Sequence, residues 1–305
     1  MERRGGLTTI PRMVNLPGLA GSPAAGRCLV MGVVNVTPDS FSDGGRWFGA
    51  TAAVEHGLEL IAQGADIVDV GGESTRPGAQ RVSADEELRR VKPVITELVK
   101  AGAVVSIDTM RAQVAEWAVE AGVSLVNDVS GGLADPYMPR LVAKAGIPYV
   151  VMHWRGHSHD MYSRAVYADV VREVHDELAQ RIDAVTGEGV DPSMIVLDPG
   201  LGFSKNPAPR GAEAHNWQLL AGLRDLATIG GREFPVLVGA SRKRYLSRLF
   251  DSGGEPRPFL QNDAATAAIT ALSAAAGAWC VRVHQVPANA DAVRVAAAYR
   301  AAARS

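Results

Sequence analysis

One pattern recurs along most of this chain and restricts the folds that it can adopt. An amphipathic stretch ends in Gly, a short apolar run follows, and a polar residue closes the run, as where Gly64 precedes residues 67–68 and then Asp69. Glycine suits the left-handed backbone position that follows a helix. Short β-branched runs that are apolar on both faces are typical of buried parallel strands. The pattern therefore predicts helices that alternate with parallel strands.

The number of these runs indicates how the predicted sheet is arranged. Eight apolar runs occur, at residues 29–34, 67–68, 104–107, 125–126, 149–152, 195–197, 236–239 and 279–283. Eight βα units fit an α/β fold, a single-domain (β/α)8 TIM barrel over residues 27–305. An open doubly wound sheet is the alternative fold, but the first predicted βα turn, residues 35–40, lacks the G-x-G-x-x-G of dinucleotide-binding sheets.

The first 26 residues differ from the rest of the chain. Residues 1–26 are rich in Gly, Pro and Arg and contain no continuous apolar segment of the kind found in secretory signals. Because they also precede the first predicted strand, we expect them to form a disordered tail outside the barrel.

Composition and missing motifs exclude several classes of protein. The formal net charge is −2 at pH 7, so we expect no nucleic-acid partner. The chain has two cysteines and no CxxC, which excludes a disulfide scaffold and a cysteine zinc finger and favours a cytoplasmic location. No apolar run reaches the roughly 20 residues of a membrane-spanning helix, so we expect no membrane association. The motifs of P-loop NTPases, α/β-hydrolases and zincins do not occur.

A polar residue ends each predicted strand. In a barrel, the carboxyl ends of the strands form the active face. The polar residues expected there are Asn35, Asp69, Asp108, Asn127, Asp128, His153, Asp198, Lys243, Arg282 and His284. They sort by type, since the middle strands bring carboxylates and amides whereas the last two bring basic side chains.

This sorting predicts two subsites. Asp108, Asn127 and Asp198 would form a hydrogen-bonding pocket for a flat heterocycle, because a carboxylate accepts two parallel N–H bonds from a guanidine-like edge. The basic residues of the last two units fall where barrels commonly hold phosphate. Asn35 could offer a neutral oxygen to Mg²⁺ on a pyrophosphate, since Mg²⁺ often relies on water and substrate oxygens.

Two loops next to these subsites have the composition of mobile lids. Residues 37–45 follow the first predicted strand, and residues 71–78 follow the second. Both loops are small, polar and interrupted by glycines, as lids over active sites tend to be.

These residues lie in segments that resemble the bacterial dihydropteroate synthases, the folate-pathway enzymes that sulfonamides inhibit. The matching segments are MGVVNVTPDSFSDGG (31–45), DVGGESTRPGA (69–79), SIDTMR (106–111), VNDVSGG (126–132), VMHWRG (151–156), LDPGLGFSK (197–205), VGASRKR (238–244) and VRVH (281–284). They run in family order within residues 27–305. The resemblance implies a (β/α)8 barrel, usually a homodimer, that joins 6-hydroxymethyl-7,8-dihydropterin diphosphate to 4-aminobenzoate.

The resemblance also implies roles for individual residues. Asn35 corresponds to the Mg²⁺ ligand, and Arg282 and His284 take the diphosphate. The residues expected around the pterin are Asp108, Asn127, Met152, Asp198 and Lys243. Those expected around the aminobenzoate are Thr75, Arg76, Phe203 and Ser241. No side chain is expected to act as a nucleophile, so Lys243, Arg282 and His284 would act electrostatically, the last two on the departing diphosphate.

Two other functions remain open at this point. A methyltetrahydrofolate:corrinoid methyltransferase shares the Asp/Asn pocket but needs no diphosphate site, so Lys243, Arg282 and His284 argue against it. A non-catalytic pterin-binding paralogue should have lost loop or basic residues, whereas every matched position is filled.

Overall fold

A closed barrel of parallel strands forms the centre of the molecule. The structure, a computed structural model, describes residue 16 and residues 26–37, 45–74, 81–156, 164–208, 210–212, 214–251 and 256–303. The barrel strands are β1 Leu29–Asn35, β2 Ile67–Gly71, β3 Val105–Asp108, β4 Leu125–Asp128, β5 Tyr149–Met152, β6 Ile195–Asp198, β9 Leu237–Val238 and β10 Cys280–Val283. The predicted runs and the observed strands agree to within a few residues at their ends.

The order of the strands shows how the barrel closes. The 8-stranded sheet runs β6-β5-β4-β3-β2-β1-β10-β9, and each neighbouring pair is parallel. A parallel bridge between Leu197 and Val236 joins the two ends of this order, and the Leu197 amide donates to the Pro235 carbonyl at 2.8 Å. The predicted TIM barrel is therefore confirmed. A short antiparallel pair, β7 Thr228–Ile229 and β8 Arg232–Glu233, was not predicted.

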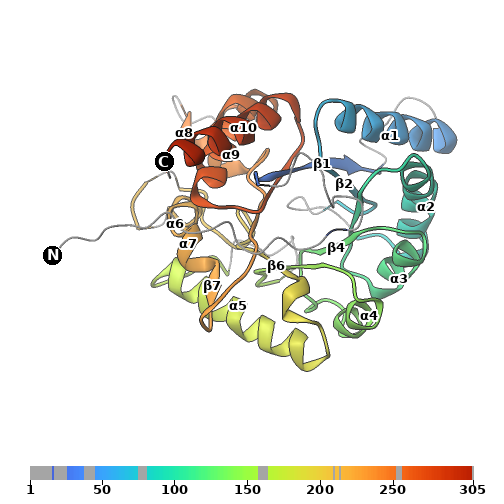
Figure 1. The fold of residues 1–305 in the computed structure, drawn as a ribbon, viewed down its shortest axis with the longest axis horizontal. Coiled ribbons are helices and arrows are strands. Elements are labelled where there is room, and N and C mark those ends of the chain that lie inside the picture. The colour runs from blue at the N-terminus through green and yellow to red at the C-terminus, as the bar shows by residue number, and fades with distance from the viewer. Residues whose placement is uncertain are drawn as a thin grey trace.

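Helices surround the barrel in chain order (Figure 1). They are α1 Gly45–Ala62, α2 Ala84–Lys100, α3 Ala112–Glu120, α4 Met138–Ala145, α5 Val170–Gly187, α6 His215–Ala221, α7 Leu223–Leu226, α8 Arg244–Leu249, α9 Asp263–Ala276 and α10 Pro287–Ala302, with 3-10 turns at Pro192–Met194 and Phe259–Asn262. As predicted, glycine in the left-handed region follows helices, for example Gly64 with φ 107° and Gly146 with φ 62°. None of the described helices is long and apolar enough to cross a membrane.

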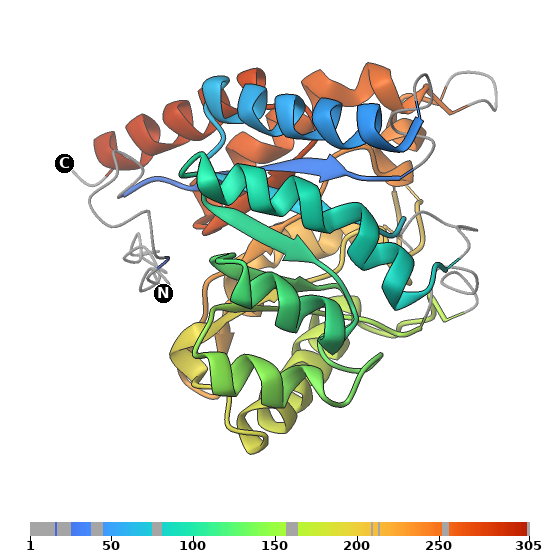
Figure 2. The same ribbon diagram turned by 90° about the vertical axis from the view of Figure 1, so that its right-hand side faces the viewer.

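The strands are apolar on both faces because each face packs against a different cluster. Along β1, Leu29 and Met31 join the cluster that fills the barrel interior. Val30 and Val34, which alternate with them, join the larger cluster between strands and helices. Figure 2 shows the barrel from the side, with the strand arrows pointing to the same end. That end carries the polar residues that follow the strands.

One residue of the N-terminal segment is part of the core. Leu16 is 2% exposed and belongs to the interior cluster, together with Leu29, Ile67 and Trp279. The expectation of a disordered tail did not include such a contact, because no apolar run marks this segment. The other residues of 1–25 lie outside the described residues, and the expectation stays a prediction for them.

Candidate active site

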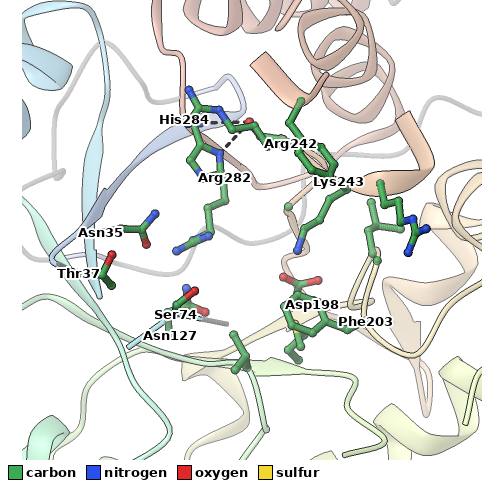
Figure 3. Close-up of a pocket in the computed structure, with 18 of the residues that line it drawn as sticks. Asn35, Thr37, Ser74, Asn127, Asp198, Phe203, Arg242, Lys243, Arg282 and His284 are labelled. Carbon is green, nitrogen blue, oxygen red and sulfur yellow. Dashed lines mark hydrogen bonds between the residues drawn. The ribbon is translucent and has the colours of Figure 1, made fainter. Parts of the chain in front are cut away.

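A cavity of about 600 Å³ opens at the carboxyl ends of the strands (Figure 3). Its lining comes from nearly all parts of the barrel: Asn35, Thr37, Ser74, Asn127, Val129, Met152, Asp198, Leu201, Gly202, Phe203, Gly239, Ser241, Arg242, Lys243, Arg244, Phe259, Leu260, Arg282 and His284. Residues that are up to 249 positions apart, Asn35 and His284, therefore meet in one space. Strand pairing produces this convergence, since parallel strands deliver their ends to one face.

A charged network lies on one side of the cavity. Arg282 donates from Nε to Asp69 Oδ2 at 2.6 Å and from Nη2 to Asp108 Oδ2 at 2.7 Å. Asn127 Nδ2 donates to the same Asp69 oxygen at 3.0 Å, which leaves the Asn127 oxygen as an acceptor for a ligand. Burial raises the pKa of Asp108, while the Arg282 cation opposes this shift. Burial would lower the pKa of Arg282, but Asp69 and Asp108 outweigh it and the guanidinium stays charged.

Asp198 occupies the opposite side, where Lys243 extends towards it (Figure 3). Asp198 is 7% exposed, and its Oδ1 accepts a 2.7 Å hydrogen bond from the Gly200 amide. Burial raises the pKa of Asp198, against this bond and against the Lys243 and Arg282 cations. Burial also lowers the pKa of Lys243 to about 8. The carboxylate is thus oriented by its own turn, with its second oxygen left for a ligand.

The basic residues are held by neighbours that also line the cavity. Ser241 Oγ accepts from the His284 amide at 3.2 Å and lies 3.0 Å from His284 Nδ1, so it orients this ring (Figure 3). Lys243 Nζ lies 4.0 Å from the centre of the Phe203 ring, within the range of a cation–π contact. These contacts fix where the His284 ring and the Lys243 amine face the cavity.

An apolar wall adjoins the charged groups. Val129, Met152 and Phe203 form a small buried cluster, against which Met110 and Trp154 pack. Flat side chains and thioethers suit the face of an aromatic ring. The cavity therefore offers a flat molecule both an apolar face and a hydrogen-bonding edge.

Comparison with known proteins agrees with this geometry. The sequence profile of a family described as pterin binding enzyme matches residues 31–284. The chain belongs to the pterin-binding enzymes. This match begins in β1 and ends just after β10, so it spans the whole barrel.

Several individual relatives of this chain are named dihydropteroate synthase. The dihydropteroate synthase of Mycobacterium leprae is 51% identical to this pterin-binding enzyme over 272 residues, which cover 88% of this chain and 93% of the relative. A solved structure of Xanthomonas albilineans dihydropteroate synthase with 4-aminobenzoic acid has a TM-score of 0.80 and 45% identity, and the match covers 90% of this chain and 94% of that one. For Burkholderia cenocepacia dihydropteroate synthase complexed with 7,8-dihydropteroate, the TM-score is 0.79, the identity is 39%, and the shares are 91% and 93%.

The structure brings most of the predicted site residues of this pterin-binding enzyme together. Those that line the cavity are Asn35, Asn127, Met152, Asp198, Phe203, Ser241, Lys243, Arg282 and His284. Asp108 does not line the cavity itself, but it forms a hydrogen-bonded ion pair with Arg282, which does. Thr75 and Arg76 lie outside the described residues, as do most of the two predicted lid loops, so their roles stay predictions.

Sequence reasoning missed several residues of this site. Phe259 and Leu260, in the 3-10 turn before α9, line the cavity and are 50% and 69% exposed. An apolar pair in a Pro-rich segment is their only sequence signal, and it does not indicate a site. Asp69 was expected at this face without a role, whereas it anchors both Arg282 and Asn127.

Asp128 and His153, two of the predicted strand-end residues of this pterin-binding enzyme, do not line the cavity. Asp128 accepts from Ser130, Gly132 and Tyr149, which makes it the anchor of a turn. His153 is 1% exposed and does not line the cavity.

The described side chains of this cavity offer few ligands to a metal ion. Among the described residues there is no group of three or more His, Cys, Asp or Glu side chains arranged to hold one. Asn35 is different, because its amide lies at the cavity edge and could contribute one neutral oxygen. Such a set fits Mg²⁺ that is carried mainly by substrate oxygens and water.

Proposed function

We propose that this pterin-binding enzyme is a transferase that forms 7,8-dihydropteroate and diphosphate from 6-hydroxymethyl-7,8-dihydropterin diphosphate and 4-aminobenzoate. One observation carries the proposal: a single cavity combines a carboxylate and amide edge, an apolar wall and a set of basic side chains. These three features correspond to the pterin edge, the two rings and the diphosphate. Relatives named dihydropteroate synthase, at up to 51% identity, support it.

The pterin would bind between Asp198 and Asn127. The second oxygen of Asp198 would accept from the 2-amino and N3-H edge, while the Asn127 oxygen accepts from a further N–H. Met152 would lie against the ring face, and Lys243 would donate to a ring acceptor. Asp108, held by Arg282, would complete the charged side of the pocket.

The chemistry needs stabilised charge rather than a nucleophilic side chain. The methylene C–O bond breaks with its electron pair going to diphosphate, the aniline nitrogen forms the new C–N bond, and its proton leaves to water. Arg282 and His284 would stabilise the charge that develops on the leaving group. Phe203 and Ser241, with Thr75 and Arg76 from the loop after β2, would order the weakly nucleophilic aniline beside the methylene.

Mg²⁺ would be held by diphosphate oxygens and by the Asn35 amide. When bound, it supplies positive charge that neutralises the diphosphate. Asn35 itself would orient the diphosphate end of the substrate, at the cavity edge near Thr37 (Figure 3).

The basic side chains of the cavity distinguish the synthase from the two other functions. A methyltransferase has no need of Lys243, Arg282 and His284 around one cavity. A non-catalytic paralogue has no need to keep Arg282 charged and His284 oriented. The basic side of the cavity therefore favours the synthase.

The deciding experiment uses the purified full chain with Mg²⁺, the dihydropterin diphosphate and 4-aminobenzoate. We expect dihydropteroate and diphosphate in equal amounts, and inhibition of their formation by a sulfonamide that competes with 4-aminobenzoate. If the pterin diphosphate binds but no dihydropteroate forms, the chain is a binding protein and the proposal is wrong.

The resemblance also leads us to propose a homodimer in the cytoplasm. The described surface has exposed apolar side chains on α9 and α10, including Leu272, Val295 and Tyr299, each at least 65% exposed. Sedimentation of the purified chain would give its mass in solution, and a monomer at micromolar concentration would contradict the dimer.

A further inference from the structure

The wall of the cavity between β6 and α6 has an unusual backbone. Leu201, Gly202 and Phe203 from this segment line the cavity. Gly202 has φ 78°, and Ser204, which is not glycine, has φ 47°. A left-handed backbone at a residue with a side chain costs energy, so neighbouring groups must hold this conformation.

Side chains behind this wall satisfy its backbone groups one by one, Tyr167 from a half-buried position and Asn216 from a buried one. Tyr167 donates from its hydroxyl to the Ser204 carbonyl at 2.9 Å. Asn216 accepts from the Gly202 amide at 2.7 Å and donates to the Asn206 carbonyl at 3.0 Å. The wall is therefore fixed from behind, on the side away from the cavity.

Lys205 makes the largest set of these contacts. It is fully buried, and its Nζ donates to the Phe203 carbonyl at 2.9 Å and lies 3.4 Å from the Gly200 carbonyl. The third contact of the Nζ is with His153 Nδ1, at 3.0 Å. Lys205 does not line the cavity, so it serves neither substrate directly.

Burial lowers the pKa of Lys205 to about 7, and His153 connects this amine to a carboxylate. Because Lys205 donates to Nδ1, the ring proton lies on Nε2, which is 2.8 Å from Glu177 Oε2. Burial and the Lys205 cation lower the pKa of His153 to about 4, so the ring is neutral. Although burial opposes it, hydrogen bonds from His153 and Arg155 bring the pKa of Glu177 to about 2. A neutral imidazole therefore connects the buried amine of Lys205 to the Glu177 carboxylate.

We propose that Lys205 is a positioning residue, which holds the Gly200 and Phe203 carbonyls so that the Phe203 ring faces the aminobenzoate subsite. This inference rests on the proposed function. The sheet holds the backbone of Asp198 in β6, and its carboxylate is oriented by the Gly200 amide rather than by the Gly200 carbonyl that faces Lys205. Loss of Lys205 should therefore disturb Asp198 less than the Phe203 ring, whose carbonyl Lys205 binds directly. We therefore expect the role of Lys205 to concern mainly 4-aminobenzoate, one of the two substrates.

The test compares Lys205→Met with the wild-type chain. Removal of the ammonium frees the Phe203 and Gly200 carbonyls, and we expect the KM for 4-aminobenzoate to rise roughly 10- to 100-fold, since small misplacements cost about that much. The dissociation constant of the pterin diphosphate, measured by calorimetry, should stay within about threefold of wild type. Equal loss of both affinities, or no change in either, overturns the proposal.

A second variant covers the case in which Lys205→Met does not fold. Tyr167→Phe removes one hydroxyl that donates to the same wall, and we expect the KM for 4-aminobenzoate to rise about 3- to 10-fold, a smaller selective effect from one lost hydrogen bond. If the KM does not change, the wall does not need these anchors and the proposal is wrong.

The matched control is Thr270→Val, which removes a buried hydrogen bond of 2.6 Å to Asn289 between α9 and α10. It should lower the melting temperature and leave both substrate constants unchanged. Wild type must form dihydropteroate in the same assay. Failure of wild type would refute the proposed function, whereas active wild type with unselective variants refutes only the role of Lys205.

Discussion

Individual residues in this cavity are oriented by partners that the sequence does not reveal. Asp198 is aimed by the Gly200 amide, His284 by Ser241, and Arg282 by two carboxylates. Preorganised groups of this kind lose little energy in reorientation when charge develops on a substrate. Single substitutions at the cavity should therefore change binding or rate more than stability.

Asp198→Asn tests the pterin edge. The Asn oxygen would keep the Gly200 amide, so its NH₂ would face a substrate N–H, and two donors would oppose each other. We expect a loss of about 2–4 kcal/mol, or roughly 30- to 1000-fold in pterin affinity, measured by calorimetry with a melting curve. Asp291→Asn, with a side chain 78% exposed, is the control and should bind normally. If Asp198→Asn binds the pterin within about threefold of wild type, Asp198 does not bind the 2-amino and N3-H edge, and this role would be reassigned to Asp108.

The pH dependence of catalysis tests Lys243. Burial places its pKa near 8, so the ammonium is charged below pH 8 and loses its proton as the pH rises through that value. We expect kcat/KM for the pterin diphosphate to fall above about pH 8, because this ratio reports groups of the free enzyme. Lys243→Arg should remove that alkaline fall, since a guanidinium stays charged. An unchanged alkaline limb in Lys243→Arg would assign the fall to another group.

At the scale of secondary structure elements, the turn after β6 leaves the least room for a change of side chain. Gly200 has φ 69°, and a Cβ there would lie 2.5 Å from the His153 carbonyl oxygen. The apolar runs and glycines of the sequence predicted this strand and its neighbours well, because burial on two faces leaves few alternatives to a parallel strand. β9, at two residues, is shorter than predicted and depends on its neighbours for its position.

Gly200→Ala should break this turn. The added Cβ would displace the His153 backbone and the Asp198 carboxylate that the turn orients. We therefore expect the free energy of unfolding to fall by at least about 2 kcal/mol, and we expect pterin binding to be lost as well. Gly187→Ala is the matched control, because no atom lies within 4 Å of its Cβ position in α5. Urea unfolding should show the control to be as stable as wild type or slightly more stable, and equal stability of both variants would contradict the prediction.

At the scale of the whole molecule, the barrel has a filled interior below the active face. Leu16 reaches this interior from the N-terminal segment, whereas the cavity opens at the other end, where the strands finish. In TIM barrels, residues at the carboxyl ends of the strands serve activity, whereas residues at the amino ends serve stability. Changes at Leu16 should therefore affect stability alone.

Leu16→Ala tests this separation. Truncation of a buried leucine typically costs about 2–4 kcal/mol in the free energy of unfolding, which urea unfolding measures. We expect kcat and both KM values to stay unchanged at 25 °C. Leu272→Ala on α9, where the side chain is 69% exposed, is the control and should lie within about 0.5 kcal/mol of wild type. No loss of stability in Leu16→Ala would show that this contact contributes nothing in solution.

The sequence by itself determined the barrel and most of the cavity. Its periodicity and its strand-end residues both follow from local chemistry. A strand that is buried on both faces must be apolar, and polar side chains follow where a barrel strand ends at the active face. Motifs such as LDPGLGFSK predicted that Asp198 and Phe203 lie on the active face.

Only the tertiary structure decided which of these polar residues face the cavity. Asp128 and Asp198 follow strands in the same way, yet one anchors a turn and the other faces the cavity. Lys205 and Glu177 are 28 positions apart, and His153 lies a further 24 positions from Glu177, yet they form one buried chain of contacts. Such pairings arise from closure of the barrel and from the need of buried charges for partners, and no local pattern encodes them.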